Sequence, residues 1–220
     1  MKYSNKKIIG VLGGMGPSAT IRFYQTIIEK CQKSGLKDNH HYPHILIYNL
    51  PAPDIINDQK NKDLTLEMIK DGLRKLESSG VNFIVIPCNT VHIFINELRK
   101  CVNVPIVSII EETLKETEND KNIIVLGSKT TIENNLYGLP GIEMSHIIKK
   151  IIAGENTAQD KRFVINTINN SEADGIILGC TELPLIVDEK DVDIPIFNSL
   201  DILAKSALKR IIKTSKTNNG

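Results

Sequence analysis

The chain lacks an excess of either charge. Its 27 Lys and Arg residues nearly balance its 26 Asp and Glu residues, which leaves a formal net charge of +1 at pH 7. Proteins that bind nucleic acid or an acidic membrane surface generally carry a clustered positive excess. The balance therefore argues against both kinds of partner.

The sequence also lacks any apolar run near the roughly 20 residues that a membrane helix needs. The first apolar stretch, "IIGVLGG", is too short for the apolar core of a signal peptide, and no small-residue cleavage site accompanies it. We therefore expect a cytoplasmic protein. With 41% hydrophobic and 24% charged residues over 220 residues, the chain is long enough for one large α/β domain or two small ones.

Cysteine pairs of the kind that bind zinc are absent. The chain has four cysteines, and no Cys-x-x-Cys spacing occurs among them: Cys31, Cys88, Cys101 and Cys180. In a reducing compartment, scattered cysteines are buried apolar residues or reactive thiols rather than disulfides. The remaining question is which of the two roles each one has.

A histidine-rich run, "HHYPH", supplies His40, His41 and His44. No acidic or cysteine cluster lies near it at the spacing of metal ligands. A polar loop before a strand is therefore favoured over a metal site, and we expect no bound metal.

Short runs rich in Ile and Val alternate with longer amphipathic segments. The runs are "KIIGVLGG", "HILIYNL", "NFIVIPC", "VPIVSII", "NIIVLGS", "DGIILGC" and "IPIFNS". Such runs are typical of strands buried on both faces of a parallel sheet. Between them, "SATIRFYQTIIEKCQKSG" and "LTLEMIKDGLRKLESSG" place apolar residues three and four apart and end at Gly, which predicts helices. We therefore expect β-α-β units wound into open α/β sheets.

The order of these elements repeats in the two halves of the chain. "IIGVLGG", "IVIPCNT" and "VPIVSI" in the first half correspond to "IIVLGSKTT", "IILGCTE" and "IPIFNS" in the second, which indicates an ancient duplication. The second copy is shorter around "LPGIEMSHIIKK". We expect an N-terminal lobe over 1–100 and a C-terminal lobe over 101–198, with a last helix over 199–213 that folds back onto the first lobe.

Two cysteines occupy the same local setting, one in each half. Cys88 ends an apolar strand and precedes Asn89 and Thr90, and Cys180 ends another and precedes Thr181. Ligands of open α/β sheets bind at the carboxyl ends of strands, and a helix N-terminus there would lower a thiol pKa. A small buried residue at a strand end is the alternative, but it does not explain why the setting recurs, or why Cys31 and Cys101 lack it.

Two lobes related by approximate symmetry would place these two sulfurs on opposite sides of one cleft. Racemisation with inversion would use such a pair directly, because one thiolate removes the α-proton while the opposite thiol donates a proton to the other face of the carbon. The repeated cysteine setting therefore points to an amino-acid racemase.

Three motifs in this order resemble the aspartate/glutamate racemase family: "GVLGGMGPSAT", "PCNTVH" and "GCTE". The resemblance spans nearly the whole chain. It implies an α/β fold of two pseudo-symmetric flavodoxin-like lobes, each a central parallel sheet flanked by helices, with the active site in the cleft. It also implies catalysis by Cys88 and Cys180 without pyridoxal phosphate or another cofactor, an amino-acid substrate, and a homodimer.

The same resemblance implies which further residues contact the substrate: Met15, Asp54, Asn89, Thr90, Ser128, Thr131, Thr181 and Glu182. Lys129, in a strand-to-helix loop at the same edge of the sheet, is a further expected contact because of its position. Alternatives remain open for some of them. Thr90 and Thr181 could be helix caps only. The glycines around Met15 could form a tight turn or a dinucleotide site, although "GVLGGMGP" lacks the G-x-G-x-x-G spacing.

The chain departs from the family where cations usually hold the side-chain carboxylate of the substrate. Ile55 follows Asp54 where an Arg is common, and Ile152 precedes Gly154 where a Lys is common. A second carboxylate normally binds a cation. We expect Lys129 to replace the missing cations, and the other candidates are Lys149, Lys150, Arg22 and His92.

Aspartate racemase is thus the first interpretation, with glutamate as a second substrate. Other reactions of the wider superfamily are the alternatives: hydantoin racemase, maleate isomerase or a decarboxylase. A non-catalytic protein that binds a carboxylate in the cleft is the third interpretation.

Overall fold

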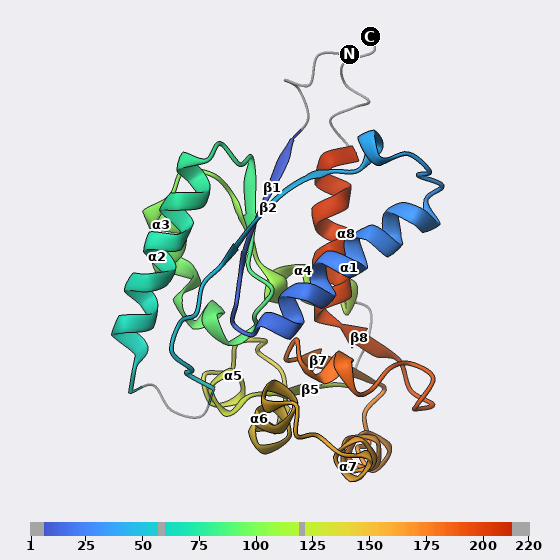
Figure 1. Cartoon of the computed structure of the whole chain (residues 1–220). Helices are drawn as coiled ribbons and strands as arrows, with labels where there is room; N and C mark the ends of the chain where they lie inside the picture. Colours follow the sequence, from blue (N-terminus) through green and yellow to red (C-terminus); the bar gives the residue numbers. More distant parts are fainter. Residues whose placement is uncertain (1–6, 57–59, 119–121, 213–220) are drawn as a thin grey trace.

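The first lobe is built on a four-stranded parallel sheet (Figure 1). In this computed structural model, which describes residues 7–56, 60–118 and 122–212, the strands lie in the order β2-β1-β3-β4. Their bounds are β1 (Ile8–Gly13), β2 (His44–Asn49), β3 (Phe83–Val85) and β4 (Ile106–Val107). The sheet therefore extends past residue 100, where the sequence placed the lobe boundary.

The second lobe repeats this plan. Its parallel sheet has the order β6-β5-β7-β8, which is the same order when each sheet is numbered from its own first strand. The strands are β5 (Ile123–Gly127), β6 (Gly141–Glu143), β7 (Gly175–Gly179) and β8 (Ile196–Asn198). This order is that of the first four strands of flavodoxin-like sheets. The expected α/β fold with two parallel sheets is confirmed.

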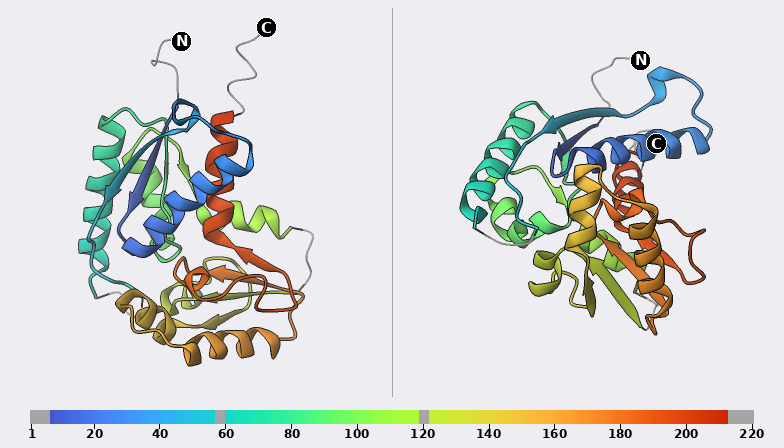
Figure 2. Two further views of the ribbon diagram at one scale, coloured as in Figure 1. Left: turned by 45° about the vertical axis from the view of Figure 1, so that its right-hand side comes forward. Right: turned by 60° about the horizontal axis from the view of Figure 1, so that its bottom comes forward.

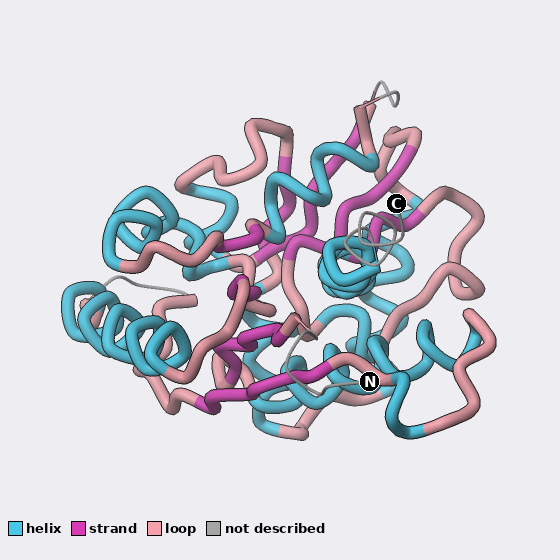
Figure 3. Tube along the Cα trace, turned by 90° about the horizontal axis from the view of Figure 1, so that it is seen from above, coloured by secondary structure: helices cyan, strands magenta, loops and turns pink. Residues whose placement is uncertain are grey.

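Helices flank both sheets, as the ribbon and the tube views show (Figures 2 and 3). The first lobe has α1 (Pro17–Lys33), α2 (Lys62–Ser78), α3 (Ile95–Cys101) and α4 (Ile109–Glu116), and the second has α5 (Lys129–Glu133), α6 (Ser145–Ala153) and α7 (Ala158–Asn169). The last helix is α8 (Ser199–Ile212), and three short 3-10 turns are η2 (Asn39–His41), η3 (Thr90–Phe94) and η4 (Leu183–Leu185). The histidine-rich run thus forms η2 and the start of β2.

The alternation of side chains along β1 divides the first lobe into two cores. Ile9 and Val11 belong to the core that includes residues of α1 and α8, whereas Leu12 belongs to the core that includes residues of α2 and α3. Successive side chains of a strand point to opposite faces, so one buried strand supports both helical layers. Parallel strands covered on both faces explain the continuous Ile and Val runs.

Two predicted helices begin and end where the sequence signals lie. Pro17 is the first residue of α1, where its missing N–H breaks no hydrogen bond. Gly35 and Gly80 follow α1 and α2 with φ of 89° and 80°, a conformation that a residue with a Cβ adopts with strain. Cys31 lies on the buried face of α1, and burial raises the pKa of its thiol.

The second lobe is shorter because the helix and the strand that follow its first strand have fewer residues than those of the first lobe. Helix α5 has 5 residues where α1 has 17, and β6 has 3 residues where β2 has 6. The shortening falls near the segment where the sequence pattern indicated a trimmed strand.

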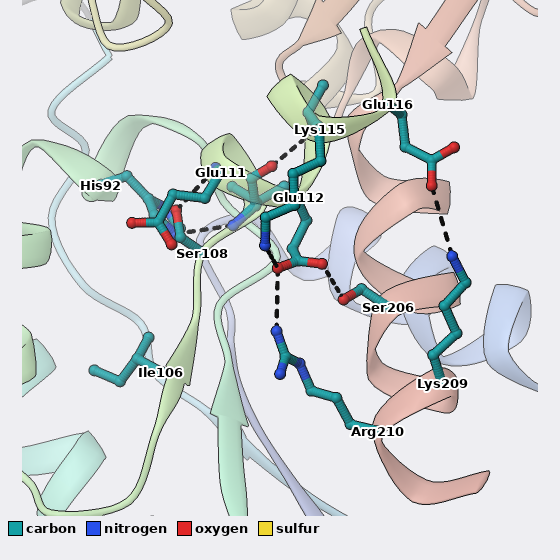
Figure 4. A network of polar contacts seen from close by, with 12 residues as sticks. His92, Ile106, Ser108, Glu111, Glu112, Lys115, Glu116, Ser206, Lys209 and Arg210 are labelled. Atoms are coloured by element: carbon teal, nitrogen blue, oxygen red, sulfur yellow. Dashed lines mark hydrogen bonds and ion pairs between the residues drawn. The ribbon is translucent and has the colours of Figure 1, made fainter. Parts of the chain in front are cut away.

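Helix α8 follows the second sheet but packs against α1 and α4 of the first lobe (Figure 1). The carboxylate of Glu112 on α4 accepts hydrogen bonds from Ser206 and Arg210 on α8 (Figure 4). Leu203 of α8 is fully buried in the same core as β1. Lys213, which the sequence placed at the end of this helix, lies outside the described residues.

No helix in the described part of the chain is long and apolar enough to cross a membrane.

We predict that Leu203→Ala lowers the free energy of unfolding by about 2–5 kcal/mol, because it leaves a cavity where α8 joins the first lobe. Urea denaturation would measure this loss. Lys205→Ala on the same helix, whose exposed side chain pairs only with Glu116 among the described residues, should change the free energy by about 0.5 kcal/mol. Equal effects of the two variants would contradict the packing of α8 on this core.

Candidate active site

A cavity of about 160 Å³ lies where the carboxyl ends of strands from both lobes meet. Most of its wall comes from the loops that follow β1, β2 and β3, and the opposite wall comes from the loop after β7 and from α6. Its lining consists of residues 14–17, 52–56, 88–91 and 180–182 together with Thr65 and Ile152. This edge of the sheets is where ligands of open α/β folds bind.

One cysteine enters this cavity from each lobe. Cys88 lies shortly after β3 and is partly exposed, and Cys180 follows β7 directly with 5% of its surface exposed. Each precedes a 3-10 turn rather than an α-helix, since η3 has 5 residues and η4 has 3. The structure therefore brings together the two cysteines that share a sequence setting, while Cys31 and Cys101 lie outside the cavity lining.

The expected lowering of the two thiol pKa values is wrong. Burial, followed by the nearby Glu182 carboxylate, raises the pKa of Cys88 to about 12, although the N–H groups of Val91 and Thr90 oppose this rise. The same two causes raise the pKa of Cys180 well above its usual value. Short 3-10 turns carry small dipoles, so desolvation dominates. Burial beside the Glu182 carboxylate therefore favours the protonated thiol at both positions.

Glu182 connects the two lobes at the cavity. Its Oε2 accepts hydrogen bonds from the Cys180 thiol at 3.0 Å and from the Thr181 hydroxyl at 3.1 Å. Its Oε1 accepts from the backbone N–H of Gly16 in the first lobe at 3.2 Å. Burial raises the pKa of this carboxyl group. Glu182 is thus a buried proton acceptor in direct contact with one sulfur.

Asn89 lines the cavity, but its side-chain amide is engaged on the protein side. Its Oδ1 accepts a hydrogen bond from the Tyr137 hydroxyl at 2.5 Å, and its Nδ2 donates to Ser199 Oγ at 3.1 Å. Ser199 in turn donates to the carbonyl oxygen of Leu178 at 2.7 Å. These bonds fix the turn that follows Cys88 to both the second sheet and α8.

Three hydroxyl groups form a buried cluster across the lobes. Thr90 Oγ1 lies 2.9 Å from Ser128 Oγ and 3.4 Å from Thr131 Oγ1, and the latter two lie 2.9 Å apart. The N-cap residues of η3 and η4 are Asn89 and Glu182 rather than Thr90 and Thr181. Ser128 instead caps α5. Of the cluster, only Thr90 lines the cavity, so Ser128 and Thr131 position Thr90 rather than reach it themselves.

Among the other expected contacts, Met15, Asp54 and Thr181 line the cavity and Lys129 does not. The Lys129 side chain is half exposed and lies 3.7 Å from Glu133. Asp54 is exposed, and its Oδ1 accepts a hydrogen bond from the N–H of Ile56 at 2.6 Å.

The remaining candidate cations also lie outside the cavity lining. Arg22 pairs with Glu29 at 3.1 Å, Lys150 pairs with Asp160 at 2.7 Å, and Lys149 lies exposed on α6. Ile55 and Ile152, in contrast, both line the cavity. The expectation that one of these cations replaces the missing pair therefore finds no support in the geometry.

His92 is a buried neutral strut rather than a cation. Its Nδ1 lies 2.8 Å from the carbonyl oxygen of Cys88, and its Nε2 accepts a hydrogen bond from the N–H of Ile109 at 3.3 Å. An acceptor at Nε2 requires the proton on Nδ1, which then donates to Cys88. Burial lowers the pKa of this imidazole to about 4. The ring therefore ties the loop that carries Cys88 to the start of α4. Figure 4 shows His92 beside Ser108 and Glu111 of that region.

No group of three or more His, Cys, Asp or Glu side chains within the described ranges is arranged to hold a metal ion.

Several positioning residues escaped the sequence analysis. Tyr137 donates a hydrogen bond to Asn89, and Ser199 accepts one from it. Thr130 donates its hydroxyl to the carbonyl oxygen of Ile55 at 2.5 Å and its backbone N–H to that of Ile56 at 3.0 Å, both on the cavity wall. The motif "GSKTT" gave a signal for Thr130, but nothing local distinguished Tyr137 or Ser199.

We predict that His92 makes stability depend on pH between about 4 and 6.5. The unfolded imidazole has a pKa near 6.5 and the folded one near 4, so below pH 6.5 only the unfolded chain gains the proton. The contribution of His92 to the free energy of unfolding is fully present above pH 6.5, and it falls as the pH drops toward 4. At about 1.4 kcal/mol per pKa unit, the loss is on the order of 3 kcal/mol.

Urea denaturation of His92→Gln across this range should give a flatter dependence of the unfolding free energy on pH. His146→Gln, on the exposed side of α6, provides the matched control and should keep the slope of the parent protein. An unchanged slope in His92→Gln would show that this imidazole is not held neutral.

Comparison with known proteins agrees with this geometry. The profile of the family described as Asp/Glu/Hydantoin racemase matches residues 12–207. The "Broad specificity amino-acid racemase RacX" of Bacillus subtilis (strain 168) is 35% identical over 219 residues, which cover 91% of this chain and 96% of that protein.

Solved structures resemble the whole fold. The aspartate racemase of Picrophilus torridus superposes with a TM-score of 0.80 at 26% identity, over 93% of this chain and 94% of that one. An aspartate racemase homologue from Pyrococcus horikoshii OT3 superposes with a TM-score of 0.73 at 26% identity, over 94% and 99%. With the profile covering most of the sequence and both lobes, the chain belongs to the Asp/Glu/hydantoin racemase family of isomerases.

Proposed function

We propose that the protein is an amino-acid racemase that works without pyridoxal phosphate, with Cys88 and Cys180 as its two acid/base groups. The observation that carries the proposal is that each lobe contributes one cysteine to a single cavity. The family membership and the similarity to racemases over most of the chain support the same reaction class.

In the proposed reaction, the α-carbon lies between the two sulfurs. A thiolate on one side removes the α-proton and becomes a thiol, and the electron pair is held by the α-carboxylate as an enediolate. The thiol on the other side donates its proton to the opposite face of the carbon and becomes a thiolate. The configuration inverts, and the roles of Cys88 and Cys180 are exchanged for the reverse direction.

Substrate binding would lower the thiol pKa values, so that a thiolate can form. Both sulfurs have raised pKa values because they are desolvated beside the Glu182 carboxylate. The positive α-ammonium group of the substrate opposes these effects. The Cys180 proton can pass to Glu182 Oε2, its hydrogen-bond acceptor at 3.0 Å. Proton transfer to Glu182 creates the thiolate without exposing the site to water.

The polar lining offers partners for the groups that every amino acid carries. Asp54 is the acidic side chain at the cavity that could pair with the α-ammonium group. The hydroxyls of Thr90 and Thr181 line opposite walls and could hold the α-carboxylate, together with backbone N–H groups at the turns. Met15 lies in the loop above them.

Aspartate, with glutamate second, is the substrate that the family resemblance implied, and it serves as the reference substrate. The similar protein from Bacillus subtilis is described as having broad specificity. The side chain that the cavity accepts is therefore a separate question from the reaction type.

Binding without catalysis is the second candidate, and the raised thiol pKa values favour it over other enzymatic reactions. A carboxylate that raises the melting temperature without exchange of its α-proton would support this alternative.

The homodimer and the cytoplasmic location remain predictions. Large apolar side chains are exposed on the edge strand β2, namely Leu46 and Ile47. Exposed apolar surface of this kind is a candidate contact between two copies. Sedimentation equilibrium of the full chain would measure the oligomeric state.

We predict that Cys88→Ala and Cys180→Ala each reduce racemisation by at least about 10²-fold, because each face of the α-carbon needs its own acid/base group. Deuterium incorporation at the α-carbon in D₂O, with chiral chromatography of the product, would measure the loss. Cys101→Ala is the matched control, since Cys101 lies outside the cavity lining. Normal turnover in either of the first two variants would exclude the two-thiol mechanism.

We predict that Glu182→Gln lowers kcat more than it changes KM, by about 10–100-fold, because the amide cannot take the Cys180 proton. The pH profile of kcat should also change. A purely structural role would instead reduce stability and leave the shape of that profile intact. Melting temperature and pH profile together distinguish the two roles.

A further inference from the structure

The wall of the cavity carries no positive charge among the residues that the structure describes. Its charged lining residues are Asp54 and Glu182, and both are acidic. The Glu182 carboxylate already accepts hydrogen bonds from Cys180, Thr181 and Gly16. The cations expected from the sequence form ion pairs elsewhere or lie exposed outside the lining.

Isoleucines form the part of the wall where the family commonly has cations. Ile55 and Ile56 come from the loop after β2, and Ile152 comes from α6 on the opposite lobe. Thr130 fixes the first two, because its hydroxyl donates to the carbonyl oxygen of Ile55 and its backbone N–H donates to that of Ile56. This wall is therefore held in place across the lobe interface.

Ile152 has an exposed apolar side chain at this wall. It is 43% exposed, although a large aliphatic side chain in a helix normally packs into the core. Exposed apolar surface inside a pocket is typical of sites that bind apolar ligand groups. The methyl and methylene groups of a substrate side chain would cover it.

A second carboxylate would meet unfavourable surroundings at this wall. It would lose hydration beside two acidic groups and apolar side chains, without a cation to replace the water. An uncharged isostere of the same size would avoid this penalty. The distal part of the cavity therefore discriminates by charge and not only by size.

We infer, on the basis of the proposed racemase function, that the enzyme acts on amino acids whose side chains carry no negative charge. The first carbons of the side chain contact the wall formed by Ile55, Ile56 and Ile152. Asparagine, glutamine, leucine and methionine belong to this class, and aspartate and glutamate do not. The aliphatic stem of lysine fits the same wall.

Isosteric pairs test the inference with the full-length protein. The rate of α-proton exchange in D₂O is measured for L-asparagine against L-aspartate and for L-glutamine against L-glutamate, with L-leucine and L-methionine alongside. We expect kcat/KM to be at least about tenfold higher for the uncharged member of each pair. Burying the side-chain carboxylate without a cation should lower kcat/KM by at least this factor.

A charge-restoring variant gives an independent measurement. Ile152→Lys places an ammonium group at the cavity wall, and its exposed position lets the chain fold around the change. It should raise kcat/KM for aspartate relative to asparagine by at least about tenfold. Ile21→Lys is the matched control, because Ile21 is 68% exposed on α1 and lies outside the cavity lining; it should leave the ratio unchanged.

The outcomes separate the inference from the function on which it rests. Exchange that is as fast with aspartate and glutamate as with their amides would overturn the inference and leave the racemase proposal intact. Absence of exchange with every amino acid would overturn the racemase proposal itself. If the ratio of kcat/KM for aspartate to that for asparagine is the same in Ile152→Lys and Ile21→Lys, this wall does not discriminate by side-chain charge.

Discussion

The desolvation of two thiols between opposing lobes is the constraint on which the site depends. Cys88 and Cys180 follow strands of different sheets, and each packs against the hydrophobic core of its own lobe where the two lobes meet at one cavity. Burial keeps both sulfurs protonated until a positively charged group enters. In the proposed reaction, the ammonium group of the substrate is the positive charge that favours a thiolate.

The surrounding polar contacts hold this arrangement from both sides. Glu182 reaches the N–H of Gly16, Thr90 meets Ser128, and Asn89 is tied to Tyr137 and Ser199. These bonds cross between lobes or between a turn and α8. Buried polar groups are stable only when they are paired, so each contact also fixes the relative position of the lobes. The same hydrogen bonds therefore hold the candidate active site and the interface between the two lobes.

Two positions at which this sequence departs from the family lie in the wall of the cavity. Ile55 and Ile152 lie where the resemblance implied cations, and both face the space in which the side chain of the substrate would lie. The acid/base chemistry needs only the α-carbon and its two substituents common to all amino acids. On the proposed function, the cysteines determine the reaction type and the isoleucine wall determines side-chain selectivity, so the two properties can change independently.

The sequence by itself determined the sheets, the repeat and the pairing of Cys88 with Cys180, because buried parallel strands leave continuous Ile and Val runs and a duplication preserves their order. Only the tertiary structure decided the thiol protonation, the neutral His92 strut and the exclusion of Lys129 from the cavity. Each of these depends on which groups, distant in the sequence or brought close by the local fold, surround a side chain and how much water they displace. Such long-range desolvation leaves no local pattern in the sequence, which is why the lowered thiol pKa values were expected and raised ones are found.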